Sequence, residues 1–96
     1  MKPQKINNWK VYIVECKDGT YYTGITNNIN KRIKNHNSGR GSKYTKGRRP
    51  VILKANSILL SHSKAAKYER LIKKLNRKKK INAVEGIPNI NLLLEE

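Results

Sequence analysis

The sequence predicts one small α+β domain, and three patterns support this prediction. Two strand-forming segments, residues 9–16 and 20–26, are separated by a short turn-forming stretch, which is typical of a β-hairpin. Two later segments, 29–37 and 64–76, repeat apolar residues at helical spacing, and residues 51–58 between them alternate like a third strand. A chain of 96 residues buries only about 60–65% of its unfolded surface, so all of these elements must share one core.

Residues 9–84 are expected to form this domain. Residues 1–8 are polar and contain Pro3, so we expect a flexible N-terminal lead-in. Residues 85–96 are expected to form a C-terminal tail, which either docks on the domain or extends away from it.

The hairpin loop has two alternatives that differ in register. A two-residue turn would place Tyr12 and Tyr22 on opposite faces of the sheet. A three-residue loop, residues 17–19 with Gly19 in the left-handed conformation, would instead put Tyr12 opposite Gly24 and on the same face as Tyr22. We favour the three-residue loop.

The first helix is predicted at 29–37, because side chains that cap helices precede it. Ile29 and Ile33 give it an apolar face, and Arg32 and His36 share that face at helical spacing. An arginine on a core-facing side is unusual, since charged groups are rarely buried without a partner.

The second half of the chain is more basic. Residues 39–50 are predicted to be a loop too polar to pack, either a solvated connector or a segment that lies against phosphates. Tyr44 among basic residues favours the second alternative. The helix at 64–76 carries Glu69 inside its apolar stripe, residues 77–80 are a basic cluster, and a short third helix is predicted at 81–84.

The net charge is +16, from 22 Lys and Arg against 6 Asp and Glu. Self-repulsion on this scale opposes folding, so a polyanionic partner is the natural explanation. We expect nucleic acid, most simply DNA; a merely basic protein is the alternative. The single Cys16 excludes an internal disulfide and a cysteine-based zinc site, and we expect it to be buried packing rather than a nucleophile.

The chain is expected to be cytoplasmic. No apolar run approaches the roughly 20 residues that span a bilayer. The N-terminus also lacks the apolar core of a secretory signal.

The candidate residues suit phosphodiester hydrolysis. That reaction requires a group that takes a proton from water, cations that stabilise charge on phosphorus, and a means of neutralising the leaving oxygen, commonly a divalent metal. Mg²⁺ prefers oxygen ligands and keeps several waters, so one or two carboxylates can suffice. Glu69 is the candidate ligand, because it lies on an apolar face within a basic helix.

Each candidate also has an ordinary structural interpretation. Glu69 could form an ion pair with Arg32 or Arg70, and His36 could be a satisfied histidine at the edge of the core. The two tyrosines could be strand packing. Gly24, which would let a ligand approach closely, favours the functional interpretation.

Five short motifs follow one another along the chain: Val11-Tyr12-Ile13, Tyr22-Thr23-Gly24, Arg32, His36 and Glu69. In this order and spacing they resemble the GIY-YIG nuclease superfamily. The closer similarity is to its small stand-alone bacterial members, the YhbQ-like group, in the segments C-K-D-G-T-Y-Y-T-G-I-T, H-N-S-G-R-G-S-K-Y-T-K-G-R-R-P and E-R-L-I-K-K-L. The resemblance covers residues 9–83. Each motif is weak alone, whereas all of them in order are a strong signal.

The resemblance implies a small three-stranded antiparallel sheet flanked by helices, and a nuclease that uses a single divalent cation, Mg²⁺ or Mn²⁺, held by Glu69. Tyr12 would be the general base or would orient the water. Tyr22, Arg32 and His36 would contact the reacting phosphate. We therefore expect an endonuclease acting on DNA, with branched, single-stranded or damaged forms as candidate substrates and a link to DNA repair or processing.

The chain departs from the family pattern at Lys10, Val11 and Thr23. These are backbone and packing positions, so the catalytic side chains remain intact. Family endonucleases often owe target choice to an extra DNA-binding domain, and none is expected here. Three sources of selectivity stay open: the shape of the nucleic acid, a protein partner, or little selection at all. We expect a monomer.

The residues expected to bind nucleic acid come from the 39–50 segment and the basic cluster. They are Arg40, Lys43, Tyr44, Lys46, Arg48, Arg49, Arg77 and Lys78. Two alternatives to an enzyme remain, a non-catalytic nucleic-acid-binding module and a basic RNA-associated protein. Glu69 separates them from a nuclease, because binding alone has no use for an inward carboxylate.

Overall fold

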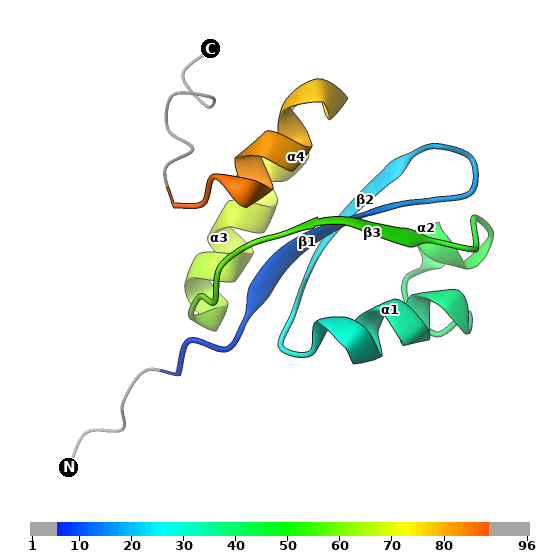
Figure 1. Ribbon diagram of the computed structural model, residues 1–96, viewed down its shortest axis with the longest axis horizontal. Coiled ribbons are helices and arrows are strands. Elements are labelled where there is room, and N and C mark those ends of the chain that lie inside the picture. Colours follow the sequence, from blue (N-terminus) through cyan, green and yellow to red (C-terminus); the bar gives the residue numbers. More distant parts are fainter. Residues whose placement is uncertain (1–5, 89–96) are drawn as a thin grey trace.

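The computed structural model describes residues 6–88 (Figure 1). Most of the predicted lead-in, residues 1–5, and most of the predicted tail, residues 89–96, lie outside the described residues. No helix in the described part is long and apolar enough to cross a membrane.

A three-stranded antiparallel sheet forms the centre of the domain, which confirms the predicted fold class. Its strands are β1 (Lys10–Glu15), β2 (Tyr21–Thr26) and β3 (Ile52–Asn56), in the spatial order β2-β1-β3. Because β1 is the middle strand, layers of side chains cover both its faces, and all four residues of 11–14 are buried. This explains why β1 is a nearly continuous apolar run rather than an alternating one.

The hairpin has the favoured register. Tyr12 pairs with Gly24, and Val14 pairs with Tyr22. The amide of Cys16 donates to the carbonyl of Thr20 at 2.8 Å, and the loop closes with a glycine at φ +83°. The three-residue loop is therefore confirmed, and both tyrosines belong to one face.

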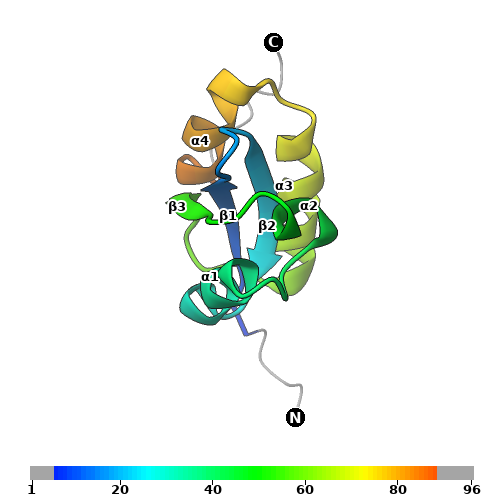
Figure 2. The same cartoon turned by 90° about the vertical axis from the view of Figure 1, so that its right-hand side faces the viewer.

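Helices cover the two faces of the sheet (Figures 1 and 2). On one face, α1 (Ile29–Asn37) packs Ile29 and Ile33 over a cluster that contains Tyr12, Val14 and Cys16. Burial raises the pKa of the Cys16 thiol, consistent with a packing role. Short helix α2 (Lys43–Lys46) lies beside α1.

The opposite face carries α3 (His62–Lys73) and α4 (Arg77–Glu85). They bury the second cluster against the odd-numbered side chains of β1. Its buried members are Val11, Ile13, Ala55, Leu60, Ala65, Ile72, Ala83, Val84 and Ile87.

Two sequence-based predictions need correction. Residues 39–50 are not a loop throughout, because Ser42 caps α2 and Thr45 is fully buried. The last helix begins at Arg77 rather than at residue 81, since Asn76 caps it, so the basic cluster is helical. The buried core also includes Ile87, which follows this helix.

Gly19 provides a test of the loop. A β-carbon at φ +83° is strained even though no atom lies within 4 Å of it, so we expect Gly19→Ala to destabilise the protein by about 1–2 kcal/mol. Gly47 is a matched control, because it has φ −88° and equally open surroundings. Gly47→Ala should be close to neutral in urea unfolding. An equal loss of stability in both variants would contradict the left-handed conformation of Gly19.

Candidate active site

Tyr12 lies at the centre of the candidate site. It is fully buried on the α1 face of the middle strand. Its hydroxyl lies 2.7 Å from Nε2 of His36, and Nε of Arg32 donates to the same oxygen at 3.2 Å. Arg32 and His36 are four residues apart on α1, so one helical turn brings both to that hydroxyl.

Two glycines make room for this arrangement. A β-carbon on Gly24 would lie 2.6 Å from the Tyr12 hydroxyl oxygen, so the Tyr12 side chain occupies the space over β2 that we had expected a ligand to use. A β-carbon on Gly41 would overlap Nδ1 of His36 and lie 2.8 Å from its Cα. The backbone before α2 can approach His36 only because residue 41 is glycine.

The other side of His36 is closed by Thr45. Nδ1 of His36 lies 2.8 Å from Oγ1 of this buried threonine. Both ring nitrogens of the fully buried histidine are therefore engaged. The phosphate contact that the resemblance implies for His36 would require one of these two hydrogen bonds to open.

Tyr22 completes the aromatic side of the site. Its ring centroid is 6.4 Å from that of Tyr12 and 5.3 Å from that of His36. Tyr44 of α2 stacks against Tyr22 at 6.0 Å, and the guanidinium of Arg48 lies 4.0 Å from the centroid of the Tyr44 ring. This stack holds Tyr22 half-buried between β2 and α2.

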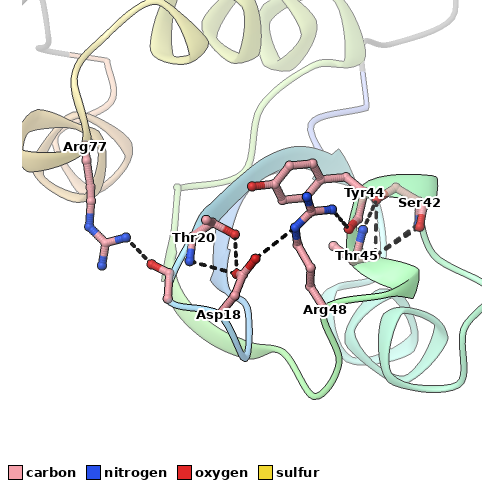
Figure 3. Close-up of polar contacts among 8 residues, drawn as sticks. Asp18, Thr20, Ser42, Tyr44, Thr45, Arg48 and Arg77 are labelled. Atoms are coloured by element: carbon pink, nitrogen blue, oxygen red, sulfur yellow. Dashed lines mark hydrogen bonds and ion pairs between the residues drawn. The ribbon is translucent and has the colours of Figure 1, made fainter.

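Two of the predicted nucleic-acid-binding arginines hold the hairpin loop (Figure 3). Nε of Arg48 donates to Asp18 at 3.0 Å, and its Nη1 donates to the backbone oxygen of Tyr44 at 2.7 Å. Arg77, at the start of α4, donates to the carbonyl of Gly19 on the other flank of the loop. Both arginines therefore already have partners within the fold.

The other predicted nucleic-acid-binding residues are exposed. They are Arg40, Lys43, Tyr44, Lys46, Arg49 and Lys78. Arg49 donates from Nε to the carbonyl of Lys46 at 2.8 Å, which ties the end of α2 to the following segment.

Glu69 lies on a helix of the other layer, which covers the opposite face of the sheet. Its helix, α3, packs against β2 and β1, and its side chain is half-buried. In the described chain its ion pair is with Lys73, one turn on, at 3.5 Å. The structure therefore does not show the alternative ion pair of Glu69 with Arg32 or Arg70.

Glu69 offers a single carboxylate, which suits a hard divalent cation rather than zinc. Within residues 6–88 there is no cluster of three or more His, Cys, Asp or Glu side chains that could hold a metal. Zinc generally needs at least three protein ligands. Mg²⁺ accepts one or two carboxylates and completes its shell with water and phosphate oxygens. Glu69 could supply that single carboxylate.

Burial controls protonation in the site. It raises the pKa of Tyr12 to about 12, although the hydrogen bond from Arg32 acts in the opposite direction, and the charge of Glu69 adds to the rise. Burial, followed by the charge of Arg32, lowers the pKa of His36 to about 4. At neutral pH the pair is therefore a phenol and a neutral imidazole.

Sequence reasoning missed Thr45 and Gly41. Both lie in the segment that we had expected to be a loop, where polar residues and glycines give no periodic signal. The available signal was the spacing of Ser42 and Thr45, which form a reciprocal capping box at the start of α2.

The lowered pKa of His36 predicts that the folded protein loses stability in acid. Its folded pKa lies below the unfolded value of about 6.5, so the unfolded chain binds more protons between pH 6.5 and 4, and stability falls as the pH is lowered through this window. The contribution is on the order of 3 kcal/mol. Urea unfolding across this range should show a steeper pH dependence for the wild type than for His36→Gln. If stability depends on pH equally steeply in both proteins, the lowered pKa of His36 is wrong.

Comparison with known proteins identifies the family. Residues 8–82 match the family model of the GIY-YIG catalytic domain. UPF0213 protein SH2523 of Staphylococcus haemolyticus is 48% identical over 75 residues, which cover 78% of this chain and 92% of that one. UPF0213 protein BCE33L0031 of Bacillus cereus is 54% identical over 69 residues, 72% of each chain.

Among solved structures, the solution NMR structure of UPF0213 protein BH0048 from Bacillus halodurans is 44% identical. It aligns with 88% of this chain and 92% of its own, at a TM-score of 0.49. None of these names states a reaction. The family match covers most of the chain, from the first strand to the last helix, and the chain therefore belongs to the GIY-YIG family of nucleases.

Proposed function

We propose that this protein is a divalent-metal-dependent endonuclease that hydrolyses phosphodiester bonds in DNA. The observation that carries the proposal is the meeting of Arg32 and His36 at the Tyr12 hydroxyl. Membership of a nuclease family and a net charge of +16 support the same conclusion.

Arg32 and Tyr22 are proposed to receive the phosphate. Both are half-buried, whereas Tyr12 and His36 are fully buried. A guanidinium binds two phosphate oxygens at once and remains charged. When Arg32 turns to the phosphate, its Nε leaves Tyr12, and the hydroxyl becomes available to a water molecule.

Tyr12 is proposed to take the proton from the attacking water. Because its pKa is raised to about 12, a free phenolate is rare at neutral pH, so proton transfer has to be concerted with attack. Glu69 would hold the divalent cation, which when bound neutralises charge on the leaving oxygen.

The exposed basic side chains are proposed to hold the nucleic acid around this site. They come from the α2 region and the start of α4, and their binding should weaken steeply with salt. Branched, single-stranded or damaged DNA are the proposed substrates, with a role in repair or processing. The buried free thiol of Cys16 is compatible with a reducing, cytoplasmic location.

The first experiment compares nucleic-acid cleavage by the wild type and by a variant altered at Glu69. Single-stranded, duplex and branched DNA and RNA would be incubated with Mg²⁺, Mn²⁺ or EDTA. We expect metal-dependent cleavage of DNA by the wild type, and a loss of about 100-fold or more in Glu69→Gln. Binding by this variant should persist, because the change only removes a negative charge.

Glu85→Gln is the matched control. It makes the same charge change at an exposed residue near the end of α4, so cleavage should be unchanged. If Glu69→Gln cuts like the wild type, the proposed role of Glu69 is wrong. Tight binding by a wild type that never cleaves would instead favour a nucleic-acid-binding module.

Tyr12→Phe tests the proton-accepting group. The variant keeps the ring but removes the oxygen that joins His36 and Arg32, so we expect kcat to fall by about 100-fold or more. Tyr21→Phe removes the same atom from a neighbouring residue whose ring packs with the α3–α4 cluster, and it should retain activity. Calorimetry would establish that both variants fold. Unchanged cleavage by Tyr12→Phe would refute its role.

A further inference from the structure

The proton of the Tyr12 hydroxyl needs an acceptor. Buried polar hydrogens nearly always have one, and Tyr12 is fully buried. Within the described chain its oxygen has two hydrogen-bonding neighbours, Nε2 of His36 at 2.7 Å and Nε of Arg32 at 3.2 Å. Arginine has donors only. Nε2 of His36 is therefore the acceptor, and it must be unprotonated.

The single proton of the neutral imidazole then lies on Nδ1. Nδ1 faces Oγ1 of Thr45 at 2.8 Å, so the threonine oxygen accepts this hydrogen bond. The proton of Thr45 itself has two acceptors on Ser42, its carbonyl oxygen at 3.3 Å and its Oγ at 3.2 Å. In the opposite tautomer, the Tyr12 oxygen would face two N–H donors, and its own proton would lack an acceptor among the described residues.

We propose that Thr45 is a positioning residue that fixes the Nδ1–H tautomer of His36 and so directs the hydroxyl proton of Tyr12 to Nε2. The catalytic consequence rests on the proposed nuclease function. The tautomer itself does not, because it follows from buried hydrogen bonds in the resting protein.

This arrangement gives the hydrolysis a complete proton path. As the water oxygen bonds to phosphorus, one water O–H bond breaks and its proton passes to Tyr12. The original Tyr12 proton passes at the same time to Nε2 of His36. The bond from phosphorus to the leaving oxygen breaks, and that oxygen keeps the electron pair and takes a proton from solvent. Tyr12 stays a phenol, and both N–H groups of the transient imidazolium have acceptors, on Tyr12 and Thr45. After the products leave, Nε2 returns its proton to Tyr12, whose other proton passes to solvent, so the imidazole is neutral again.

The surroundings of Thr45 keep its hydroxyl in place. The residue is fully buried, and the capping box holds both its backbone amide and its side chain to Ser42. Gly41 brings this part of the chain against the imidazole ring. In a helix Thr has only two common χ1 rotamers, and the bond from Oγ1 to the carbonyl of Ser42 favours the one seen here.

Long-range ¹H–¹⁵N NMR correlations of uniformly ¹⁵N-labelled, full-length protein test the tautomer directly, because they distinguish the protonated ring nitrogen from the bare one. We expect Nδ1 of His36 to be protonated in the wild type. A protonated Nε2 would overturn the proposal. His62, which is exposed on α3, gives a second imidazole in the same spectrum for comparison.

Thr45→Val and Thr45→Ser separate the hydrogen bond from the shape. Valine keeps the branched side chain but cannot accept the Nδ1 proton, so the Nδ1–H tautomer loses a hydrogen bond and the Nε2–H tautomer should become populated beside it. Serine keeps the hydroxyl and should retain Nδ1–H. An unchanged tautomer in a folded Thr45→Val protein would refute the role of Thr45.

Cleavage assays test whether the tautomer of His36 affects activity. In Thr45→Val we expect kcat to fall by about 10-fold to 100-fold, as for other outer hydrogen-bond partners of functional histidines, with KM little changed. Thr45→Ser should remain near the wild type. If kcat is unaffected while the tautomer shifts, the proton path is wrong although the tautomer assignment holds. If the wild type cleaves nothing, the nuclease proposal fails, and the NMR result still decides the tautomer.

Discussion

The pairing of Tyr12 with Gly24 across the hairpin is the constraint on which the site depends. Only a glycine leaves room above β2 for the tyrosine side chain, and only this register puts Tyr22 on the same face. A slip of one residue would turn every side chain of the strand to the opposite layer. The loop that closes the hairpin therefore determines which helix Tyr12 meets, and through α1 it determines that Arg32 and His36 find the same oxygen.

Much of this could be predicted from the sequence, because it follows from local periodicity. The preference of Gly19 for positive φ indicated the register, and helical spacing placed Arg32 beside His36. The partners of His36 and Arg48 could not be predicted in this way. Thr45 lies nine residues beyond His36 in a segment rich in lysine and glycine, and Asp18 lies thirty residues before Arg48. Composition indicates that such a segment is polar and basic, but it cannot indicate which of its hydroxyl or guanidinium groups will turn inward.

The few acidic residues have specific positions in a chain of net charge +16. Glu15 pairs with Lys54 and Arg77, Asp18 with Arg48, and Glu69 with Lys73. Each of these pairs is at least partly exposed, so its contribution to stability is small. Their main effect is to fix where particular cations lie, while the surplus positive charge stays on the surface. Binding of a polyanion would relieve the mutual repulsion of that surplus.

The loop between β1 and β2 has a consequence for binding. It is held by Arg48 from the α2 side and by Arg77 from the α4 side, so one short turn connects the layers on opposite faces of the sheet. A phosphate that recruits either arginine must first displace a carboxylate or a carbonyl of this turn. Weakly bound or misplaced anions would leave the two arginines bonded to the turn. A nucleic-acid strand with well-placed phosphates would bind one of them and weaken its hold on the turn. Ligand affinity and the rigidity of the domain would then vary in opposite directions.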